Sequence, residues 1–344
     1  MKTKALFLLI MVTLFFLTTA AEEFQLSEIF QPKRICIDDD YLYVRDHACA
    51  CVALYSLPKA TFARKIGKKG EGPGEMPISP YFSIAPGKVL LHSISKLIVF
   101  SNDGTLIKEI SLPTLSSIYR IGAVGDNYVA VRTRYEVNRK ESFRSIGETI
   151  LCDKNFKTIK SLKQWENLES RTNAMGKQYR EPIKGCRIFR TWKNKIYVPE
   201  PDKGLYLEVY DTEGNLEKVI HTGYKKILVG ADAKKEAVRA YFNKRYMTQE
   251  RKAALKKRLL FRFPEFYPAI WDFVVQDDNI YIKTYEKNDR ELVKFLVLDL
   301  NGKLVKSVFL PDINNLLYFI KNNTFYYLEE DVDKETWLLK VLKI

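Results

Sequence analysis

Short apolar runs alternate with turn residues along almost the whole chain. In six places a turn of Asp, Asn, Gly or Lys is followed at once by a short strand rich in Tyr, Val and Ile. Such runs, bounded by turn residues, predict hairpins of antiparallel strands. The six turns are Asp38-Asp39-Asp40, Pro86-Gly87-Lys88, Gly125-Asp126-Asn127, Lys193-Asn194-Lys195, Asp277-Asp278-Asn279 and Lys321-Asn322-Asn323.

A second turn follows in five of these six repeats, each time between two further apolar strands. Each repeat therefore predicts four antiparallel strands, and repeated four-stranded sheets are typical of a β-propeller. We expect an all-β, six-bladed propeller; two β-sandwiches are the alternative, and they give no reason for six matching hairpins. The second turns are Leu57-Pro58-Lys59, Asn102-Asp103-Gly104, Lys154-Asn155-Phe156, Thr212-Glu213-Gly214 and Leu300-Asn301-Gly302.

The sixth repeat lacks its fourth strand. It ends at Ile344 after three predicted strands, which would leave an open sheet edge. The segment Phe24–Ile29 has the length and alternation of a strand. We therefore expect the N-terminal strand to complete the last blade and close the ring.

Residues 1–21 have the pattern of a secretory signal peptide. Lys2 and Lys4 precede an apolar stretch, Ala5–Leu17, and small residues follow it. This stretch is shorter than the roughly 20 residues that a spanning helix needs, so an uncleaved anchor is the lesser alternative. No cysteine lies near the cleavage region, which argues against a lipoprotein. We expect a single soluble propeller domain at 22–344, exported to the periplasm or the outside.

Composition and charge bear on the partner. A chain with 46% hydrophobic and 28% charged residues is neither disordered nor a polytopic membrane protein. The net charge of +14 attracts anionic partners. Export argues against nucleic acid and favours an envelope protein, an anionic glycan or a small anionic ligand. Peripheral contact with an anionic membrane stays open, as does a solvated basic surface without any partner. We expect a monomer.

The long connections all fall at one end of the predicted blades. They are Arg134–Glu148, Lys163–Gly185 and His221–Pro268. Long loops on one rim of a rigid scaffold are where binding sites are usually built. The last connection, between blades four and five, predicts a helical insertion at about 225–268.

This insertion is strongly basic. Lys234–Arg262 contains 11 basic and two acidic residues. Helices are predicted at Ala233–Phe242 and Thr248–Leu260, the second capped by Thr248 and ended by Pro264. One interpretation is a basic docking arm that uses Lys252, Lys256, Lys257 and Arg258. The other is an amphipathic hairpin packed on the rim with solvated lysines.

Arginines and aromatic residues are expected at the mouth of the channel. Guanidinium groups bind carboxylates or phosphates, and rings stack on apolar faces, so such a set suits an anionic or sugar-like ligand. The alternative is that these side chains fill a narrow channel and pair with acidic neighbours. The candidates are Arg34, Tyr81, Tyr119, Arg120, Arg187, Trp271 and Asp272.

Two short segments carry a resemblance to a known family. The loop Ile66–Met76, with Gly70-Glu71-Gly72-Pro73-Gly74-Glu75-Met76, resembles the G-x-G-P-G-E-F element of exported bacterial six-bladed propellers, relatives of NHL-repeat proteins. Phe263–Ile270 is similar to the entry into a late blade of that family. The resemblance implies the fold and export. Met76 stands where Phe is common, and the family's frequent lipoprotein Cys is missing. A tight inter-blade turn is the main interpretation of the loop, and an anion-binding nest the other.

No catalytic constellation is evident. The histidines, His47, His92 and His221, lack metal-site spacing, and we expect no cofactor. Calcium in the channel, as in the calcium-dependent lactonase and lyase propellers, is the alternative, with Asp272 as the only obvious acidic candidate. Most of the five cysteines are expected to be small buried apolar residues, and a disulfide of Cys36 with Cys49 or Cys51 is the lesser alternative. We therefore expect a non-catalytic binding or scaffold protein of the cell envelope; a channel hydrolase or lyase is the alternative.

Overall fold

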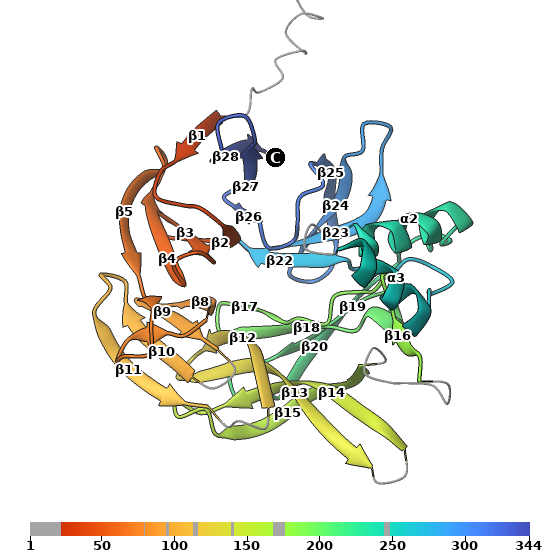
Figure 1. The fold of residues 1–344 in the computed structure, drawn as a ribbon, viewed down its shortest axis with the longest axis horizontal. Coiled ribbons are helices and arrows are strands. Elements are labelled where there is room, and N and C mark those ends of the chain that lie inside the picture. The colour runs from red at the N-terminus through yellow and green to blue at the C-terminus, as the bar shows by residue number, and fades with distance from the viewer. Residues whose placement is uncertain are drawn as a thin grey trace, which may run out of the picture. The chain divides into compact units, whose positions relative to one another are not determined.

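The computed structural model describes residues 22–78, 80–93, 96–112, 116–138, 141–167, 176–243 and 248–344. The predicted signal peptide lies outside the described residues. Six four-stranded sheets follow one another along the chain (Figure 1), as the hairpin pattern predicts. We call them blades one to six in chain order. The chain is thus a six-bladed β-propeller.

The strands of blades one and two are shorter than those of blade three. Blade one contains β2(Pro32–Asp38), β3(Tyr41–Asp46), β4(Cys51–Ser56) and β5(Thr61–Ile66); blade two β8(Tyr81–Ala85), β9(Lys88–His92), β10(Lys96–Ser101) and β11(Leu106–Ser111); blade three β12(Ser116–Val124), β13(Asn127–Asn138), β14(Glu141–Cys152) and β15(Thr158–Asn167).

The remaining blades share this order. Blade four contains β17(Arg190–Trp192), β18(Lys195–Pro199), β19(Leu205–Tyr210) and β20(Leu216–Thr222); blade five β22(Asp272–Gln276), β23(Asn279–Lys287), β24(Val293–Asp299) and β25(Leu304–Leu310); blade six β26(Tyr318–Lys321), β27(Thr324–Asp331), β28(Thr336–Lys343) and β1(Glu22–Leu26).

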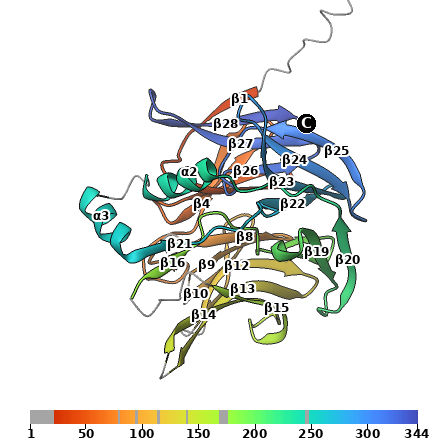
Figure 2. The same ribbon diagram turned by 90° about the vertical axis from the view of Figure 1, so that its right-hand side faces the viewer.

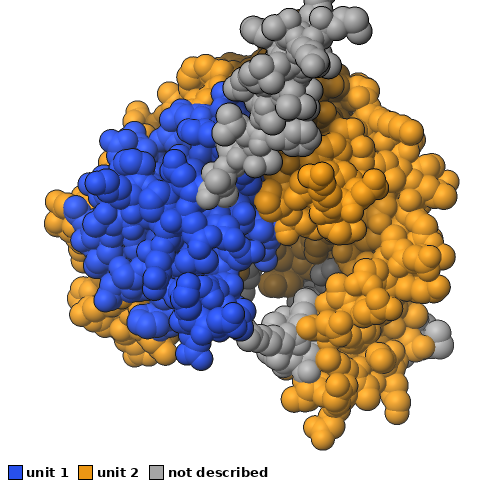
Figure 3. All heavy atoms as spheres, turned by 90° about the horizontal axis from the view of Figure 1, so that it is seen from above, with its two compact units in different colours: residues 1–48, 53–64, 313–344 blue, residues 49–52, 65–312 orange. Residues whose placement is uncertain are grey.

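The chain divides into two compact units (Figure 3). Unit 1 is formed by residues 1–48, 53–64 and 313–344, and unit 2 by residues 49–52 and 65–312. Blade six and most of blade one belong to unit 1. Blades two to five belong to unit 2, and each unit is described by itself.

In unit 1 the N-terminal strand completes blade six. Strand β1 pairs antiparallel with β28, Glu22 opposite Val341 and Leu26 opposite Trp337. This confirms the closing strand predicted from the missing fourth strand. Leu26 and Ile29 are buried and pack in one apolar cluster with Leu339. Burial of this apolar surface stabilises the attachment of the N-terminal segment.

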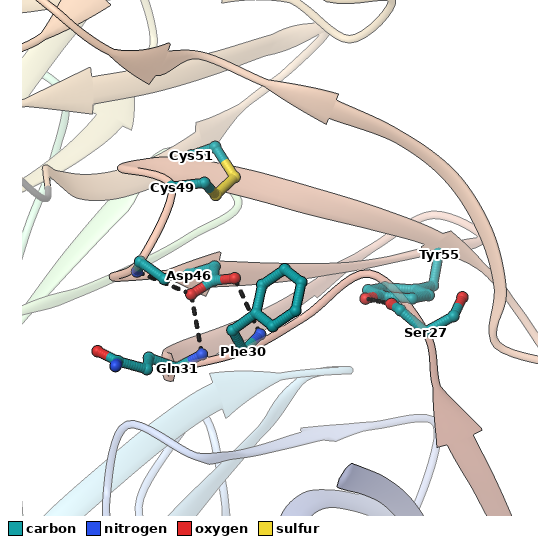
Figure 4. The surroundings of a disulfide bond; sticks show 8 residues. Ser27, Phe30, Gln31, Asp46, Cys49, Cys51 and Tyr55 are labelled. Carbon is teal, nitrogen blue, oxygen red and sulfur yellow. Dashed lines mark hydrogen bonds between the residues drawn. A yellow bond between two sulfur atoms is a disulfide. The ribbon is translucent and has the colours of Figure 1, made fainter. Parts of the chain in front are cut away.

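The crossover segment, residues 27–31, joins blade six to blade one and is held by side chains of blade one (Figure 4). The fully buried carboxylate of Asp46 accepts hydrogen bonds from the backbone N–H groups of Phe30 at 3.0 Å, Gln31 at 2.9 Å and Ala48 at 3.0 Å. The Tyr55 hydroxyl donates to the carbonyl oxygen of Ser27. Backbone groups that leave a sheet need such partners when they are buried.

In unit 2 the first hairpin turns have the conformation that their residues favour. Lys193 and Asn194 have φ of 47° and 59°, and Asp277 and Asp278 have φ of 51° and 57°. Two successive left-handed residues are typical of a type I′ turn, whose twist matches that of the flanking strands. The turn residues that predict these hairpins therefore also shape them.

The second hairpin turns repeat one hydrogen-bond pattern. The carboxylate of Asp299 accepts from the N–H groups of Asn301 at 2.8 Å and Lys303 at 2.9 Å, and Gly302 between them has φ of 87°. Asp153 and Asp211 make the equivalent bonds two and four residues on. An Asp that bonds its own following backbone fixes a tight turn.

One predicted loop is a strand pair instead. The segment Arg134–Glu148 was expected to be a long connection, but β13 and β14 continue through it, with Arg134 opposite Ile146. The expectation was wrong because Tyr135 and Ile146 extend the apolar alternation and the two strands can pair past the blade. The end of blade three is therefore an extended hairpin.

The helical insertion between blades four and five is confirmed. It consists of α2(Ala231–Phe242) and α3(Gln249–Arg258). The predicted end of the second helix was wrong, because the chain continues at once as β21(Leu259–Phe261), which pairs in parallel with β16(Gln178–Arg180). Pairing with a distant strand overrides helix propensity at Leu259. Pro264 thus follows a strand and does not end the helix.

Candidate binding site on a basic helical arm

The insertion, which we call the helical arm, is fastened to unit 2 at its base. Val229 donates its N–H to the carbonyl of Glu265 at 2.9 Å, and Tyr267 donates to Ile227 at 2.8 Å. These bonds join the chain that enters α2 to the chain that leaves β21. The pairing of β16 with β21 adds a second attachment, in which Arg262 donates to the carbonyl of Arg180 at 2.8 Å. The arm is therefore a held element and not a loose loop.

An aromatic cluster fixes α2 on this base. Tyr241, Phe242 and Phe261 lie mutually edge to face, with ring centroids 5.4 to 5.7 Å apart. Such pairs stabilise beyond their buried area. The Arg180 guanidinium donates to the Tyr241 hydroxyl at 3.1 Å. Phe242 is buried, so the C-terminal end of α2 is the packed end.

Helix α3 has a different character, because none of its residues is buried. The Thr248 hydroxyl accepts from the N–H of Arg251 at 3.3 Å, so Thr248 caps the helix as the sequence predicts. Figure 2 shows α3 at the margin of unit 2, next to β21. Its ten residues include five cations and a single acid, Glu250.

Two of the three cations of α2 make ion pairs, whereas no cation of α3 makes one with a described carboxylate. In α2, Lys235 pairs with Asp232 at 3.1 Å and Arg239 with Glu236 at 2.5 Å. Among the described residues no carboxylate pairs with a cation of α3, although Lys256 Nζ lies 5.6 Å from the centroid of the Phe242 ring. The cations of α3 are Arg251, Lys252, Lys256, Lys257 and Arg258. Exposed, unpaired cations on a held helix form a surface that attracts anions.

The predicted residues Lys252, Lys256, Lys257 and Arg258 are therefore brought together on one helix. Arg251 was missed, although the same basic run contains it. Lys252 and Leu255 are half-buried and the other three predicted cations are exposed. The alternative interpretation, an amphipathic hairpin packed on the rim with solvated lysines, also fits this exposure, so the docking role of these cations stays a prediction.

The predicted rim residue Asp272 has an ionic partner in an arginine that was not among the predicted rim residues. Asp272 is buried and makes an ion pair with Arg190, whose other nitrogen donates to the carbonyl of Phe189 at 2.9 Å. Cys186 Sγ lies 3.9 Å from the same carboxylate. Arg190 and Asp272 are 82 residues apart, and no local spacing signals their pairing. The buried carboxylate of Asp272 thus already has an ionic partner within the protein.

The surroundings of the thiol next to this pair favour its protonated form. Burial raises the pKa of Cys186 to about 11, only partly opposed by the nearby Arg190 and Arg120. The thiolate is the nucleophilic form, so a raised pKa leaves the group inert near neutral pH. Burial likewise raises the pKa of Tyr119 and Tyr285, both of which lie within electrostatic reach of Cys186.

Trp271 belongs to an aromatic stack. Tyr285 lies between Trp271 and Tyr267, with ring centroids 4.7 and 4.8 Å apart. The ammonium of the fully buried Lys283 lies 4.0 Å from the centre of the Trp271 ring and 3.1 Å from an Asp312 carboxylate oxygen. Burial lowers the pKa of Lys283, although Asp312 opposes the shift. The stack joins blade five to the base of the arm through Tyr267, whose backbone N–H donates to Ile227 there. The Tyr285 hydroxyl also donates to the Lys184 carbonyl at 2.9 Å.

The other predicted rim residues are spread over both units. In unit 2, Tyr81 stacks on His92 at 5.5 Å, and Arg187 makes an ion pair with Asp202 at 2.9 Å. Arg120 lies near Cys186. In unit 1, Arg34 lies opposite Arg45 in the pairing of β2 with β3. These contacts do not bring the seven predicted residues together within either unit, so a ligand at the rim stays a prediction.

The glycine-rich loop binds the chain's own carboxylates. The Glu75 carboxylate accepts from the N–H of Gly72 at 2.9 Å and pairs with Lys68 at 2.7 Å. The Glu109 carboxylate accepts from the N–H of Gly74 at 3.1 Å and pairs with Lys96 at 2.8 Å. The backbone donors that could hold an external anion are thus partly taken by internal ones. This favours the tight inter-blade turn over the anion site.

These two carboxylates give the loop a pH dependence. Lys68 lowers the pKa of Glu75 below its ordinary 4.5, and Lys96 does the same for Glu109. A lowered folded pKa stabilises the fold above 4.5, and that contribution is lost as the pH falls through the folded pKa. We expect Glu109→Gln to lower the melting temperature at about pH 6, and the difference from wild type to shrink towards about pH 3. Glu71→Gln, in the same loop, is the control, and a difference independent of pH would contradict the assignment.

Three of the five cysteines are unpaired, and the disulfide that does form is not the one that the sequence suggested as the alternative. Cys49 and Cys51 form a disulfide with each other (Figure 4), and Cys36, Cys152 and Cys186 are free. The alternative of a Cys36 disulfide was wrong, because Cys49 lies in the turn before β4 and its sulfur reaches that of Cys51, the first residue of this strand. The described residues contain no group of three or more His, Cys, Asp or Glu that could hold a metal ion. No helix in the described part of the chain has the length and hydropathy needed to cross a membrane.

Comparison with known families identifies the chain. A family model described as "6-bladed beta-propeller" (DUF5128) matches residues 9–197, more than half of the 344 residues. The chain belongs to this six-bladed β-propeller family. This membership agrees with the six blades of the structure. The family description names no ligand. Kinship of this six-bladed β-propeller with NHL-repeat proteins, and the motif at Ile66–Met76, remain predictions.

Solved structures support the fold of this six-bladed β-propeller. A Bacteroides fragilis NCTC 9343 protein predicted to be exported has 12% identity and a TM-score of 0.55, with 94% of this chain and 95% of that chain covered. The Cps50 (Swd1) β-propeller domain of Myceliophteria thermophila has 7% identity and a TM-score of 0.42, with coverage of 94% and 99%. The TM-score of 0.42 is too low to carry an argument. At identities of 12% and 7% the similarity concerns the fold alone. No curated protein matches the chain in sequence.

Proposed function

We propose that the chain is an exported, non-catalytic binding protein of the bacterial cell envelope that docks an anionic partner, a protein or a glycan, on α3. One observation carries the proposal. The five cations of α3 have no carboxylate partner among the described residues, although two cations of the adjacent α2 are paired. Cations held close together on one helix repel each other. An anionic partner with complementary charge would offset that repulsion.

Three further features support this proposal. The arm is attached at β16 and β21 and at the pairing of 227–229 with 265–267, so α3 is held for binding at little entropic cost. Export is supported by the signal-peptide pattern of residues 1–21 and by the structural similarity to the Bacteroides protein that is predicted to be exported. The alternative of a channel hydrolase or lyase depended on Asp272, which is paired with Arg190. A non-catalytic role therefore has the better support.

Charge reversal on α3 tests the proposal. We expect the triple variant Lys256→Glu, Lys257→Glu, Arg258→Glu to bind heparin, poly-glutamate or anionic vesicles on the order of 100-fold more weakly than wild type, since each cation near an anionic surface contributes about 1 kcal/mol. The melting temperature should change little, because α3 buries no residue and the variant loses only the contact of Lys256 with the Phe242 ring. Isothermal titration at fixed salt measures the affinities, and differential scanning calorimetry the stability.

A matched control separates the helix from the net charge. The variant Lys33→Glu, Lys59→Glu, Lys88→Glu makes the same change in net charge at exposed sites of blades one and two. We expect it to keep most of the affinity. Equal losses in the two variants, or wild-type affinity in the α3 variant, would overturn the proposal.

A further inference from the structure

The outer strand of blade five differs from the outer strands of the other blades. Among the described strands, β25 forms the edge of its sheet and pairs with β24 alone (Figure 1). Its sequence, LVKSVFL, contains a single ionisable residue, Lys306. The other five outer strands, β5, β11, β15, β20 and β1, each contain at least two charged or ionisable residues. Charged side chains are the common means by which sheet edges avoid pairing with other chains.

The apolar side chains of β25 are also exposed. Leu304 is 51% exposed, Val305 59% and Phe309 40%. Val305, Ser307 and Phe309 alternate with less exposed residues, so they share one face of the strand. An unguarded edge with an exposed apolar face predicts a partner strand.

We infer that β25 pairs antiparallel with β25 of a second copy of this chain, about a two-fold axis at Ser307. The strand is self-complementary in that register. Val305 of one copy lies opposite Phe309 of the other, Leu304 opposite Leu310, and Lys306 opposite Val308. Cross-strand apolar pairs stabilise, and no like charges stand directly opposite each other. The two four-stranded blades become one eight-stranded sheet, and a two-fold axis is the commonest symmetry of homo-oligomers.

This dimer replaces the monomer expected from the sequence and is independent of the function proposed for α3. Its salt dependence should be opposite in sign. Two copies with a net charge of +14 each repel one another, and salt screens that repulsion. We therefore expect salt to strengthen the dimer, whereas it should weaken binding of an anion to α3.

A single cysteine placed on the axis provides the sharpest test. In the proposed register Ser307 faces Ser307 of the second copy, at a Cα separation of about 4.5–5.5 Å, which a disulfide can span. We expect Ser307→Cys to form a covalent dimer under mild oxidation. Ser111→Cys, on the exposed end of the outer strand β11, and the wild type with its own free cysteines are the controls. Cross-linking of the Ser111→Cys variant to the same extent would overturn the proposal, because it would reflect random collision.

Mass measurement in solution provides the second test. Light scattering over a concentration series should give twice the chain mass for wild type. The variant Val305→Lys, Phe309→Lys places like charges opposite each other across the axis and should give the mass of one chain. Val219→Lys, on the outer strand of blade four, should leave the dimer intact. A wild-type protein that is monomeric at every concentration, and that also fails to cross-link at Ser307→Cys, would contradict the inference.

Discussion

Replacing Asp46 with alanine is expected to lower the free energy of unfolding by about 4 kcal/mol, the largest effect of a single substitution in unit 1. Its carboxylate accepts from the N–H groups of Phe30, Gln31 and Ala48 and is fully buried. Alanine leaves these three donors without their acceptor. An unsatisfied buried donor costs roughly 1–3 kcal/mol, partly recovered where water enters.

The consequence should extend to the N-terminal strand. Phe30 and Gln31 belong to the crossover segment between β1 and β2, so loosening them frees β1 from β28. Hydrogen exchange should show early loss of protection at residues 22–26, with denaturant unfolding giving the magnitude. Asp40→Ala removes the same atoms at an exposed turn and should change stability by less than about 0.5 kcal/mol. A change that small in Asp46→Ala would contradict the role assigned to the carboxylate.

Replacing Arg190 with methionine is expected to destabilise unit 2 by about 3–5 kcal/mol, because it leaves the carboxylate of Asp272 buried without its ionic partner. Arg190 and Asp272 have side-chain exposures of 15% and 6%. The cost arises from the unpaired charge and not from the loss of the pair as such. The double variant Arg190→Met, Asp272→Asn should therefore recover a large part of the stability.

A second arginine–aspartate pair, whose arginine lies three residues before Arg190 in the sequence, serves as the control. Arg187 and Asp202 lie at 2.9 Å with side-chain exposures of 33% and 73%. Exposed pairs contribute about 0–1 kcal/mol, so Arg187→Met should have a small effect. Thermal unfolding of the variants checks the ranking. If Arg190→Met were no worse than Arg187→Met, or if the double variant were worse than the single one, the ion pair would not have the structural role described.

Local chemistry explains how much of the fold could be predicted. The turns at Lys193-Asn194 and Asp277-Asp278 define hairpins because these residues adopt the left-handed conformation that the turn requires. The missing fourth strand of the last repeat predicted the role of β1. Each of these inferences depends on neighbours in sequence, which one chain displays directly.

The rest depended on contacts between distant residues. Helix propensity continues past Arg258, but β16, about 80 residues earlier, draws Leu259 into a strand. Arg190 and Asp272 meet across 82 positions. In the candidate site, the basic residues of α3 were visible as a run, whereas their lack of carboxylate partners became evident only when the neighbouring helix was placed. Pairing of charges across blades has no local signal in a single sequence.

The measurement that tests the proposed function most directly is the salt dependence of heparin affinity for wild type and for the Lys256→Glu, Lys257→Glu, Arg258→Glu variant. Each cation that neutralises a polyanion releases a counterion, so the slope of log affinity against log salt reports how many cations take part. Docking on α3 predicts that the magnitude of the slope falls by about two to three in the variant. An unchanged slope would show that the cations of α3 do not face the anion, and would contradict the proposal.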